Sequence, residues 1–206
     1  MTAPTPIPAL FYDTETTGLP LWNFPSEDPD QPHIVELSAI LATRDGPIAP
    51  PLYAIIKPDG WTIPPAMTAI HGISHERALA EGIPESDAVA RLLELWQQAE
   101  YRVAHNENFD ARIVRIALKR YAPALADRWT AGKAYCTADL STPLCALPPT
   151  EKMIAAGRGN QYKRPTLAEA HRHFFGGELE NAHNAMADAE ACWRIFLAIL
   201  KWRNGA

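Results

Sequence analysis

Residues 10–16 carry the sequence LFYDTET. Its aromatic residues and threonines are typical of a β-strand, and Gly18 and Pro20 end the run. Successive side chains of a strand point to opposite faces, so Asp13 and Glu15 share one face. Adjacent carboxylates repel each other unless a cation lies between them. The pair therefore indicates either a cation site or an acidic strand end that enters a turn.

The pattern on both sides of this stretch predicts an α/β fold. Three strands come first and would form a meander, and strands then alternate with helices, which is typical of a mixed sheet. The expected strands lie at 10–16, 34–43, 52–57, 101–105 and 134–140, and the expected helices lie at 86–99, 106–121, 166–175 and 185–202.

We expect one domain over residues 1–206, because no linker divides the chain. The proline-rich residues 1–8 are expected to form an extended lead-in, and the proline-rich segments 20–33 and 141–165 to form long surface loops.

The composition excludes several classes of protein. Hydrophobic residues make up 47% of the chain, but no apolar run is long enough to cross a membrane, and residues 1–8 do not resemble a signal peptide. A net charge of −5 argues against passive coating of duplex DNA, which usually requires a basic surface. The three cysteines are odd in number and widely spaced, so we expect free thiols and a cytoplasmic protein.

Two further carboxylates fall on apolar helix faces. Asp110 precedes Ile113 and Val114 by three and four residues, and Asp188 precedes Cys192 by four, so each acid points toward the core. An acid near a helix N-terminus is also favoured by the helix dipole, which is the alternative explanation for Asp110. Buried charge is costly without a partner, and a shared divalent ion would supply one. Oxygen ligands without thiolates favour Mg²⁺ or Mn²⁺ over Zn²⁺.

His183 precedes Asp188 by five residues, a spacing that turns about 140° around a regular helix. The two side chains could reach one site only if His183 lies in the loop before the helix. A histidine beside a bound water is a natural general base near neutral pH, whereas the alternative is a loop histidine in solvent.

Three motifs together resemble the DEDDh (DnaQ-like) family of 3′→5′ exonucleases. They are DTETTGL at 13–19, HNENFD at 105–110 and HNAMADA at 183–189, in the order that the family shows. A weaker family feature, IHGIS, lies at 70–74 between the first two motifs. The resemblance spans roughly residues 9–202 and implies a ribonuclease H-like fold, with a mixed five-stranded sheet whose first three strands are antiparallel and which helices flank.

The resemblance also implies a two-metal mechanism. Asp13, Glu15, Asp110 and Asp188 would hold two Mg²⁺ ions, for which Mn²⁺ could substitute, and His183 would remove a proton from the attacking water. All five residues would be catalytic, and the product would be a nucleoside 5′-monophosphate.

The substrate contacts that the resemblance implies lie in the same motifs. Phe109 would offer either a stacking surface or a core contact, and Asn106 would either shape the site or cap its helix. The implied substrate-binding residues are Thr16, Thr17, Leu19, Ile70, His105, Asn106 and Phe109. Four basic residues of the 141–165 segment are candidates for gripping a single strand: Lys152, Arg158, Lys163 and Arg164.

The implied substrates are the 3′ ends of single-stranded DNA or RNA, with DNA favoured. One alternative is an exoribonuclease of the oligoribonuclease or RNase T type, and another is a non-catalytic nucleic-acid-binding module on the same fold. No membrane association is expected. A homodimer is possible in such a family, and no segment of the sequence supports association with a polymerase.

Overall fold

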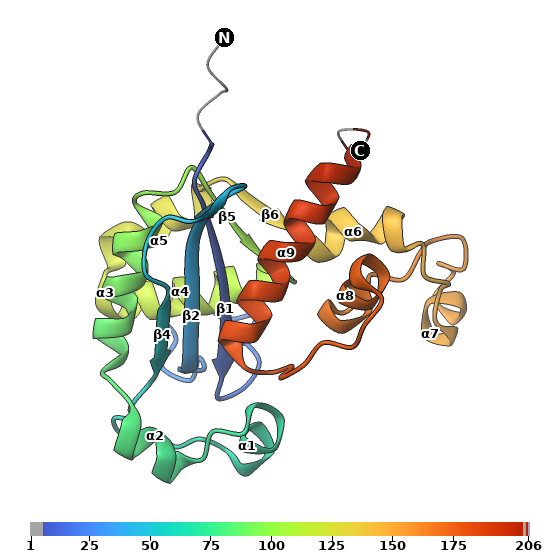
Figure 1. The fold of residues 1–206 in the computed structure, drawn as a ribbon. Coiled ribbons are helices and arrows are strands. Elements are labelled where there is room, and N and C mark those ends of the chain that lie inside the picture. Colours follow the sequence, from blue (N-terminus) through green and yellow to red (C-terminus); the bar gives the residue numbers. More distant parts are fainter. Residues whose placement is uncertain (1–5, 204, 206) are drawn as a thin grey trace.

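The computed structural model describes residues 6–203 and residue 205, and its centre is a mixed β-sheet flanked by helices (Figure 1). Strand β1 lies inside the sheet, with β2 on one side and β5 then β6 on the other, while β3 and β4 both pair with β2. The strands are β1 (Ala9–Thr16), β2 (Ile34–Thr43), β3 (Gly46–Pro47), β4 (Leu52–Ile55), β5 (Tyr101–Ala104) and β6 (Ala134–Cys136).

The strand directions confirm the expected mixed sheet. Strands β1, β2 and β4 are antiparallel neighbours, whereas β5 and β6 run parallel to β1. The sheet has six strands rather than five because the two-residue strand β3 pairs with the end of β2. Register places Glu15 opposite Glu36, so β2 contributes an acid beside the predicted pair.

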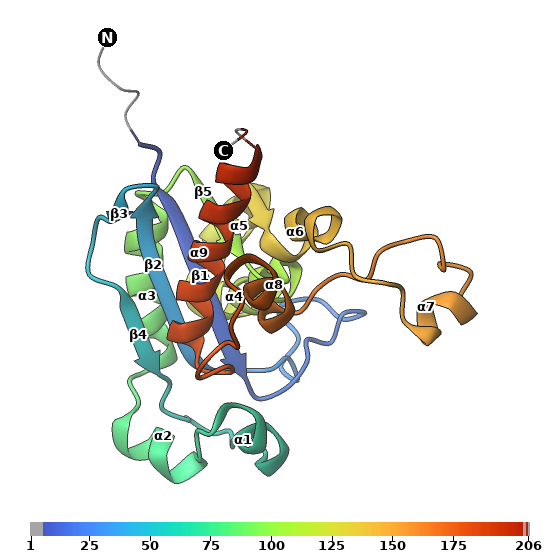
Figure 2. The same ribbon diagram turned by 45° about the vertical axis from the view of Figure 1, so that its right-hand side comes forward.

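Helices cover both faces of the sheet. Helix α9 crosses one face, and α3 and α4 cover the other (Figures 1 and 2). The helices are α1 (Pro65–His71), α2 (His75–Glu81), α3 (Glu85–Trp96), α4 (Glu107–Tyr121), α5 (Pro123–Ala131), α6 (Thr137–Cys145), α7 (Glu151–Ala155), α8 (Leu167–Phe175) and α9 (Ala185–Arg203).

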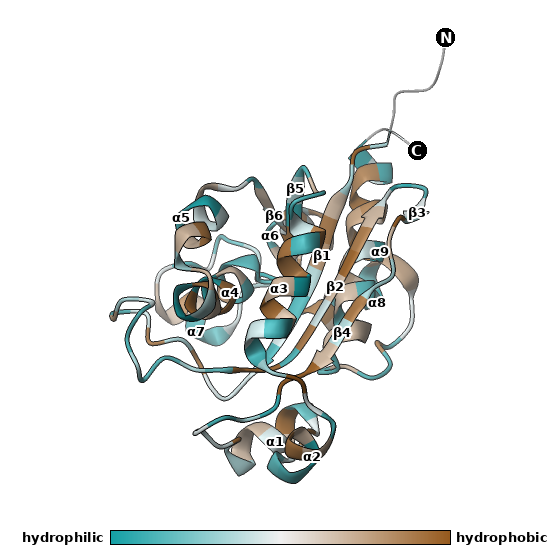
Figure 3. Ribbon diagram, turned by 90° about the vertical axis from the view of Figure 1, so that its left-hand side faces the viewer, coloured by the Kyte–Doolittle hydropathy of each residue, from teal (hydrophilic) through white to brown (hydrophobic). Residues whose placement is uncertain are grey.

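Alternation along β1 divides the core into two layers. Leu10 and Tyr12 pack toward α3, α4 and α5, whereas Ala9 and Phe11 pack against α9. Strand β2 and the first half of β1 are largely hydrophobic between the flanking helices (Figure 3), and their apolar side chains are buried. The same alternation carries Asp13 to the α9 face of the sheet, and Thr14 to the α4 face.

Two expectations about secondary structure were wrong, and three further helices were missed. The expected strand 134–140 ends at Cys136, because α6 begins at Thr137 and Ser141 donates its hydroxyl to the Thr137 carbonyl at 2.6 Å. The segment 141–165 is not irregular throughout, since it contains the end of α6 and the short α7, which stands away from the body (Figure 2). Helices α1, α2 and α5 were not expected, because each is short and lies between prolines or glycines.

Other boundaries agree with the sequence. Helix α8 has Thr166 as its N-cap in a reciprocal capping box with Glu169, and it ends at Gly176 in the left-handed conformation. Residues 20–33 contain neither helix nor strand. Within the residues that the structure describes, no helix has both the length and the apolar character that crossing a membrane would require.

Candidate active site

A pocket of about 340 Å³ lies where the C-terminal end of β1 meets the start of α4 and the turn before α9. It brings together the predicted acids and histidine, namely Asp13, Glu15, Asp110, Asp188 and His183. Four predicted substrate-binding residues also line it, namely Leu19, His105, Asn106 and Phe109. The three sequence motifs therefore converge on one concave surface.

Asp13 and Glu15 lie side by side at the end of β1 and are only partly exposed. Burial, followed by the carboxylates of Asp188 and Glu36, raises the pKa of Glu15 to about 8. Burial likewise raises the pKa of Asp13 well above its ordinary value, with Asp110 as the next largest cause. Without a cation, this end of the sheet holds more negative charge than it can stabilise.

Asp110 is fixed against β1 by two hydrogen bonds from one residue. The backbone amide of Thr14 donates to Asp110 Oδ1 at 3.0 Å, and the Thr14 hydroxyl donates to the same oxygen at 2.8 Å. The side chain is 2% exposed. Burial raises its pKa to about 7, although the bonds from Thr14 act in the opposite direction. The β1–α4 side of the pocket is therefore rigid before any ligand binds.

The opposite side is built by the turn before α9. His183 has a φ of 67° in the left-handed region, and its backbone amide donates to Asp188 Oδ2 at 3.1 Å. Asn184 Oδ1 accepts a hydrogen bond from the Ala187 amide at 3.1 Å, which is the side-chain cap that begins the helix. His183 thus lies in the loop before α9, where the sequence required it to be.

The geometry fits a cation. One ligand atom from each of Glu15, His183 and Asp188 lies within 4.8 Å of the others. Asp188 is 8% exposed, and its Oδ1 is buried without a hydrogen-bond partner among the described residues. Burial raises the pKa of Asp188 to about 6. An orphaned buried carboxylate oxygen facing other carboxylates is the environment that a bound divalent ion would stabilise.

Glu36 also shapes this side of the pocket, and sequence reasoning missed it. It is 1% exposed on β2, and its Oε2 accepts a hydrogen bond from the Ala185 amide at 2.7 Å. Its Oε1 accepts from Asn184 Nδ2 at 3.3 Å. Glu36 therefore holds the N-terminus of α9 against the sheet. The available signal was an acid inside the mostly apolar run 34–42, because a buried carboxylate is costly unless it has hydrogen-bond donors.

His105 and His183 have different environments. His105 Nε2 lies 3.1 Å from the carbonyl oxygen of Pro165, which can only accept a hydrogen bond, so Nε2 carries the proton. His105 Nδ1 then accepts a hydrogen bond from the Thr137 hydroxyl at 2.9 Å. Burial lowers the pKa of His105 to about 4. Both ring nitrogens of His105 are thus occupied, whereas His183 is exposed at the pocket.

Three predicted substrate-binding residues are not among those that line the pocket: Thr16, Thr17 and Ile70. The Thr16 hydroxyl bonds to the Gly18 carbonyl at 2.7 Å, and the Thr17 amide donates to the His33 carbonyl at 3.0 Å, so these groups serve the turn after β1. Ile70 is 49% exposed on α1.

The basic residues of the 141–165 segment divide into two pairs. Lys163 forms an ion pair with Glu169, and Arg164 bonds to Asp139 at 2.6 Å and to Asn106 Oδ1 at 2.7 Å. These two residues therefore anchor the segment. Within the described residues, no ion pair involves Lys152 or Arg158, which leaves both side chains available for an anion.

Known structures with the same fold come from bacterial exonuclease I. E. coli exonuclease I in a zinc-bound complex with single-stranded DNA aligns with a TM-score of 0.72 and 20% identity, over 98% of this chain and 42% of that one. Exonuclease I from Methylocaldum szegediense aligns with a TM-score of 0.70 and 20% identity, over 97% and 41%. This chain thus spans less than half of these proteins, and at such identity the likeness shows the fold.

Sequence comparisons identify the family. A DNA polymerase III subunit epsilon-like protein of Rhodobacter capsulatus is 32% identical over 116 residues, which are 55% of this chain and 15% of that protein. The RNase T family model, described as Exonuclease, matches residues 10–196, which include all three motifs. The chain therefore belongs to this exonuclease family.

Proposed function

We propose that this chain is a 3′→5′ exonuclease that acts on single-stranded nucleic acid, with DNA favoured, and releases nucleoside 5′-monophosphates. The observation that carries the proposal is the pocket in which acids from three separate segments meet beside an exposed histidine. Family membership supports the hydrolysis of phosphodiester bonds. The fold shared with exonuclease I, which was crystallised with single-stranded DNA, favours DNA as the substrate.

Exonucleases of this family depend on divalent metal ions, and we assign two Mg²⁺ ions to the pocket. Asp13, Glu15 and Asp188 would hold one ion, and Asp13 with Asp110 would position the other. When bound, such ions would activate a water molecule and stabilise the charge that develops on the leaving 3′ oxygen. Mn²⁺ has the same preference for oxygen ligands and could replace Mg²⁺.

His183 is assigned as the general base. Its side chain is exposed at the pocket beside Glu15 and Asp188, so it can reach a water molecule attacking from that side. It would take the proton as that water attacks the phosphorus in line with the leaving oxygen. His105 cannot take this part, because its two ring nitrogens are occupied by Thr137 and Pro165.

Substrate contacts at the pocket are assigned to four residues. Leu19 is 77% exposed at the rim, and Phe109 is partly buried opposite, so their apolar surfaces would flank the terminal base. Asn106 and His105 would shape the wall between them, and the bond from Arg164 to Asn106 would keep that wall in place.

Degradation of a 5′-labelled single-stranded oligonucleotide tests the proposal. The purified protein with Mg²⁺ should produce a ladder that shortens from the 3′ end, and EDTA should stop the reaction. Asp13→Ala should be inactive, whereas Asp45→Ala, which changes a 67% exposed side chain, should be as active as the parent. Persistent activity in Asp13→Ala would overturn the site assignment. Matched DNA and RNA oligomers decide between the favoured substrate and the exoribonuclease alternative.

His183→Ala separates the role of base from that of ligand. The loss of a general base should lower kcat on the order of 10²-fold. Binding of Mn²⁺, measured by calorimetry, should change little in the same variant. A large loss of ion affinity would instead make His183 a metal ligand.

We also propose that the chain acts as one exonuclease domain, in the cytoplasm. Its cysteines, Cys136, Cys145 and Cys192, are free, in keeping with a reducing compartment. Single-stranded 3′ ends are its proposed partners, and a homodimer would be tested by light scattering.

A further inference from the structure

A second pocket lies on the other side of α4 from the candidate active site, beside the first turns of that helix. Asn106 and Phe109 line the candidate active site, whereas Asn108 and Ala111 line the second pocket. Its volume is about 630 Å³, within the range of nucleotide-sized ligand sites. We name it the Trp22 pocket, after the exposed residue of the 20–33 loop that contributes to it.

Hydrogen bonds within the 20–33 loop and from α4 hold the backbone on both sides of Trp22. Gln31 Nε2 donates to the carbonyls of Leu21 at 3.0 Å and Pro25 at 2.9 Å, and Gln31 Oε1 accepts from the Leu21 amide at 3.0 Å. Arg112 on α4 donates to the Phe24 carbonyl at 2.5 Å. Trp22 is nevertheless 57% exposed. A large aromatic side chain kept in water by an ordered loop is typical of a surface that binds a ligand.

The Trp22 pocket also carries positive charge. Arg112 and Arg115 lie three residues apart on α4, so both guanidinium groups face it. In the part of the chain that the structure describes, Arg112 has no ion pair, and Arg115 has one distant partner, Asp127, at 4.0 Å. The Nε atoms of both arginines are buried without a hydrogen-bond partner there. Burial and the neighbouring Arg115 lower the pKa of Arg112. An anion would relieve this repulsion.

We infer that the Trp22 pocket binds a nucleotide unit of the single strand whose 3′ end occupies the active site. A base would stack on Trp22, and a phosphate would lie against Arg112 and Arg115. Both pockets lie beside the first turns of α4, and this proximity and the complementary charge favour this ligand over a protein partner. The inference rests on the proposed exonuclease function, because it assigns a second contact to the same substrate.

Strand length provides the test. Trp22→Ala and Arg115→Gln should raise the Kd of a 5′-fluorescein-labelled octathymidylate about tenfold, measured by anisotropy in EDTA to prevent hydrolysis. Trp22→Phe retains a ring and should recover most of the affinity. Arg115→Gln should also reduce the slope of log Kd against log salt concentration by about 0.7, as expected for one lost phosphate contact. Hydrolysis of a thymidine dinucleotide, too short to reach both pockets, should be unchanged in Trp22→Ala.

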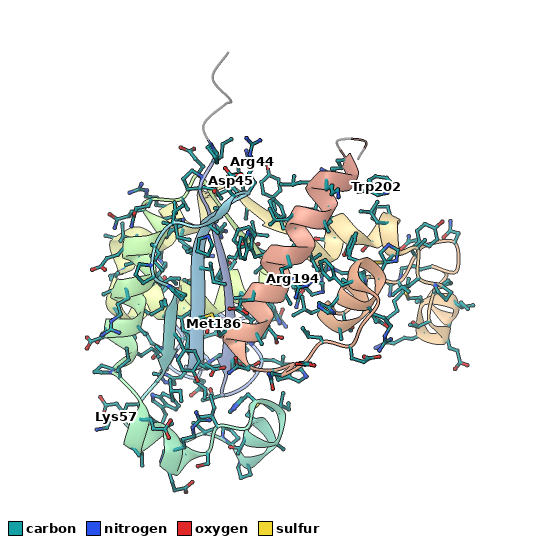
Figure 4. All side chains as sticks on the ribbon, viewed as in Figure 1. Arg44, Asp45, Lys57, Met186, Arg194 and Trp202 are labelled. Carbon is teal, nitrogen blue, oxygen red and sulfur yellow. The ribbon has the colours of Figure 1, made fainter. Side chains whose placement is uncertain are left out.

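Two matched substitutions at the other end of the molecule serve as controls. Trp202 is 62% exposed near the end of α9, and Arg44 follows β2; both lie away from the carboxyl end of β1 (Figure 4). Trp202→Ala and Arg44→Gln should bind and degrade the octamer as the parent does.

Each outcome separates this inference from the proposed function. If the parent degrades the octamer and the Trp22 and Arg115 variants bind it as well as the parent does, the Trp22 pocket does not bind the strand and the inference is overturned. The inference is also overturned if Trp22→Ala loses activity equally on the dinucleotide and on the octamer. If the parent binds the octamer through Trp22 but never shortens it with Mg²⁺, the subsite stands and the proposed function fails.

Discussion

The two walls of the pocket are built in different ways. The β1–α4 wall joins two regular elements, and Asp110 receives both of its donors from Thr14 at the centre of the sheet. The α9 wall is a turn in which His183 has a left-handed backbone, and the buried oxygen Oδ1 of Asp188 lacks a partner among the described residues. Asp110 on the first wall is thus held by two donors, whereas Asp188 on the second keeps a buried carboxylate oxygen without one.

This difference indicates which wall a bound ion should stabilise more. A cation gains little by reorganising Asp110, because that carboxylate is already held by two donors. It gains more at Asp188, whose buried Oδ1 has no hydrogen-bond donor among the described residues. We therefore expect ion binding to order the α9 wall against a β1–α4 wall that is preformed.

Removal of the orphaned carboxylate should have the largest effect. Asp188→Asn keeps the shape of the side chain but loses the charge that faces Glu15 and His183, so kcat should fall on the order of 10³-fold. Kinetics on a single-stranded oligonucleotide measure this loss. The control is Glu190→Gln, two residues further along α9 and exposed, which should retain full activity. Near-normal turnover in Asp188→Asn would mean that the α9 wall does not hold an ion.

Without metal, the crowded acids should make stability depend on pH. Folding raises the pKa values of Asp188 to about 6, Asp110 to about 7 and Glu15 to about 8, so the folded chain holds protons that the unfolded chain releases. The stabilisation is complete below the unfolded values near 4 and is lost as pH rises through 6 to 8. If the three groups titrate independently, the free energy of unfolding in EDTA should fall by up to about 8 kcal/mol between pH 5 and pH 8.

Urea denaturation at several pH values in EDTA measures this loss. Saturating Mg²⁺ should reduce this loss of stability, because the bound ion stabilises the carboxylates once they are ionised. Asp110→Asn should remove part of the dependence, whereas Asp45→Asn, at an exposed side chain, should not. A flat profile in EDTA would show that burial does not raise the pKa values of these acids.

The sequence predicted the first wall better than the second. Period-two alternation placed Asp13 and Glu15 on one face, and helical spacing turned Asp110 inward, because both rules depend only on local geometry. Sequence could only require that His183 lie before the helix. It did not predict the contact from Glu36, because that contact joins β2 to α9 across almost 150 residues, through backbone amides that no side-chain pattern encodes.

Glu36→Gln tests that long-range contact. A glutamine oxygen can still accept from the Ala185 amide, but its amide group cannot accept from Asn184 and the charge is lost. Loss of a contact that orients the residues of a metal site typically changes activity by about 10- to 100-fold. We therefore expect kcat of Glu36→Gln to fall by about tenfold with little change in KM. The control is Glu85→Gln, another buried glutamate that accepts a backbone amide, from Ile34 at 3.0 Å. It should reduce stability and leave kcat unchanged; an equal loss of kcat in both would make Glu36 a general stabilising residue.

The smallest effect should separate the two walls most directly. Thr14→Val keeps the backbone donor to Asp110 but removes the hydroxyl donor, which should reduce stability by about 1 kcal/mol. Asn184→Ala removes the cap of α9 and should reduce stability by a similar amount.

The turnover of these two variants should differ although their stabilities are similar. Thr14→Val leaves Asp110 held by the sheet backbone, so kcat should change less than about threefold, whereas the loss of the cap lets His183 and Asp188 shift and should reduce kcat about tenfold. Thr14→Ser, which retains the hydroxyl, should match the parent in both measurements. A wall that an ion must order depends on its local hydrogen bonds for catalysis, so kcat should be more sensitive at the α9 wall. Equal losses of kcat in Thr14→Val and Asn184→Ala would mean that both walls are equally adjustable.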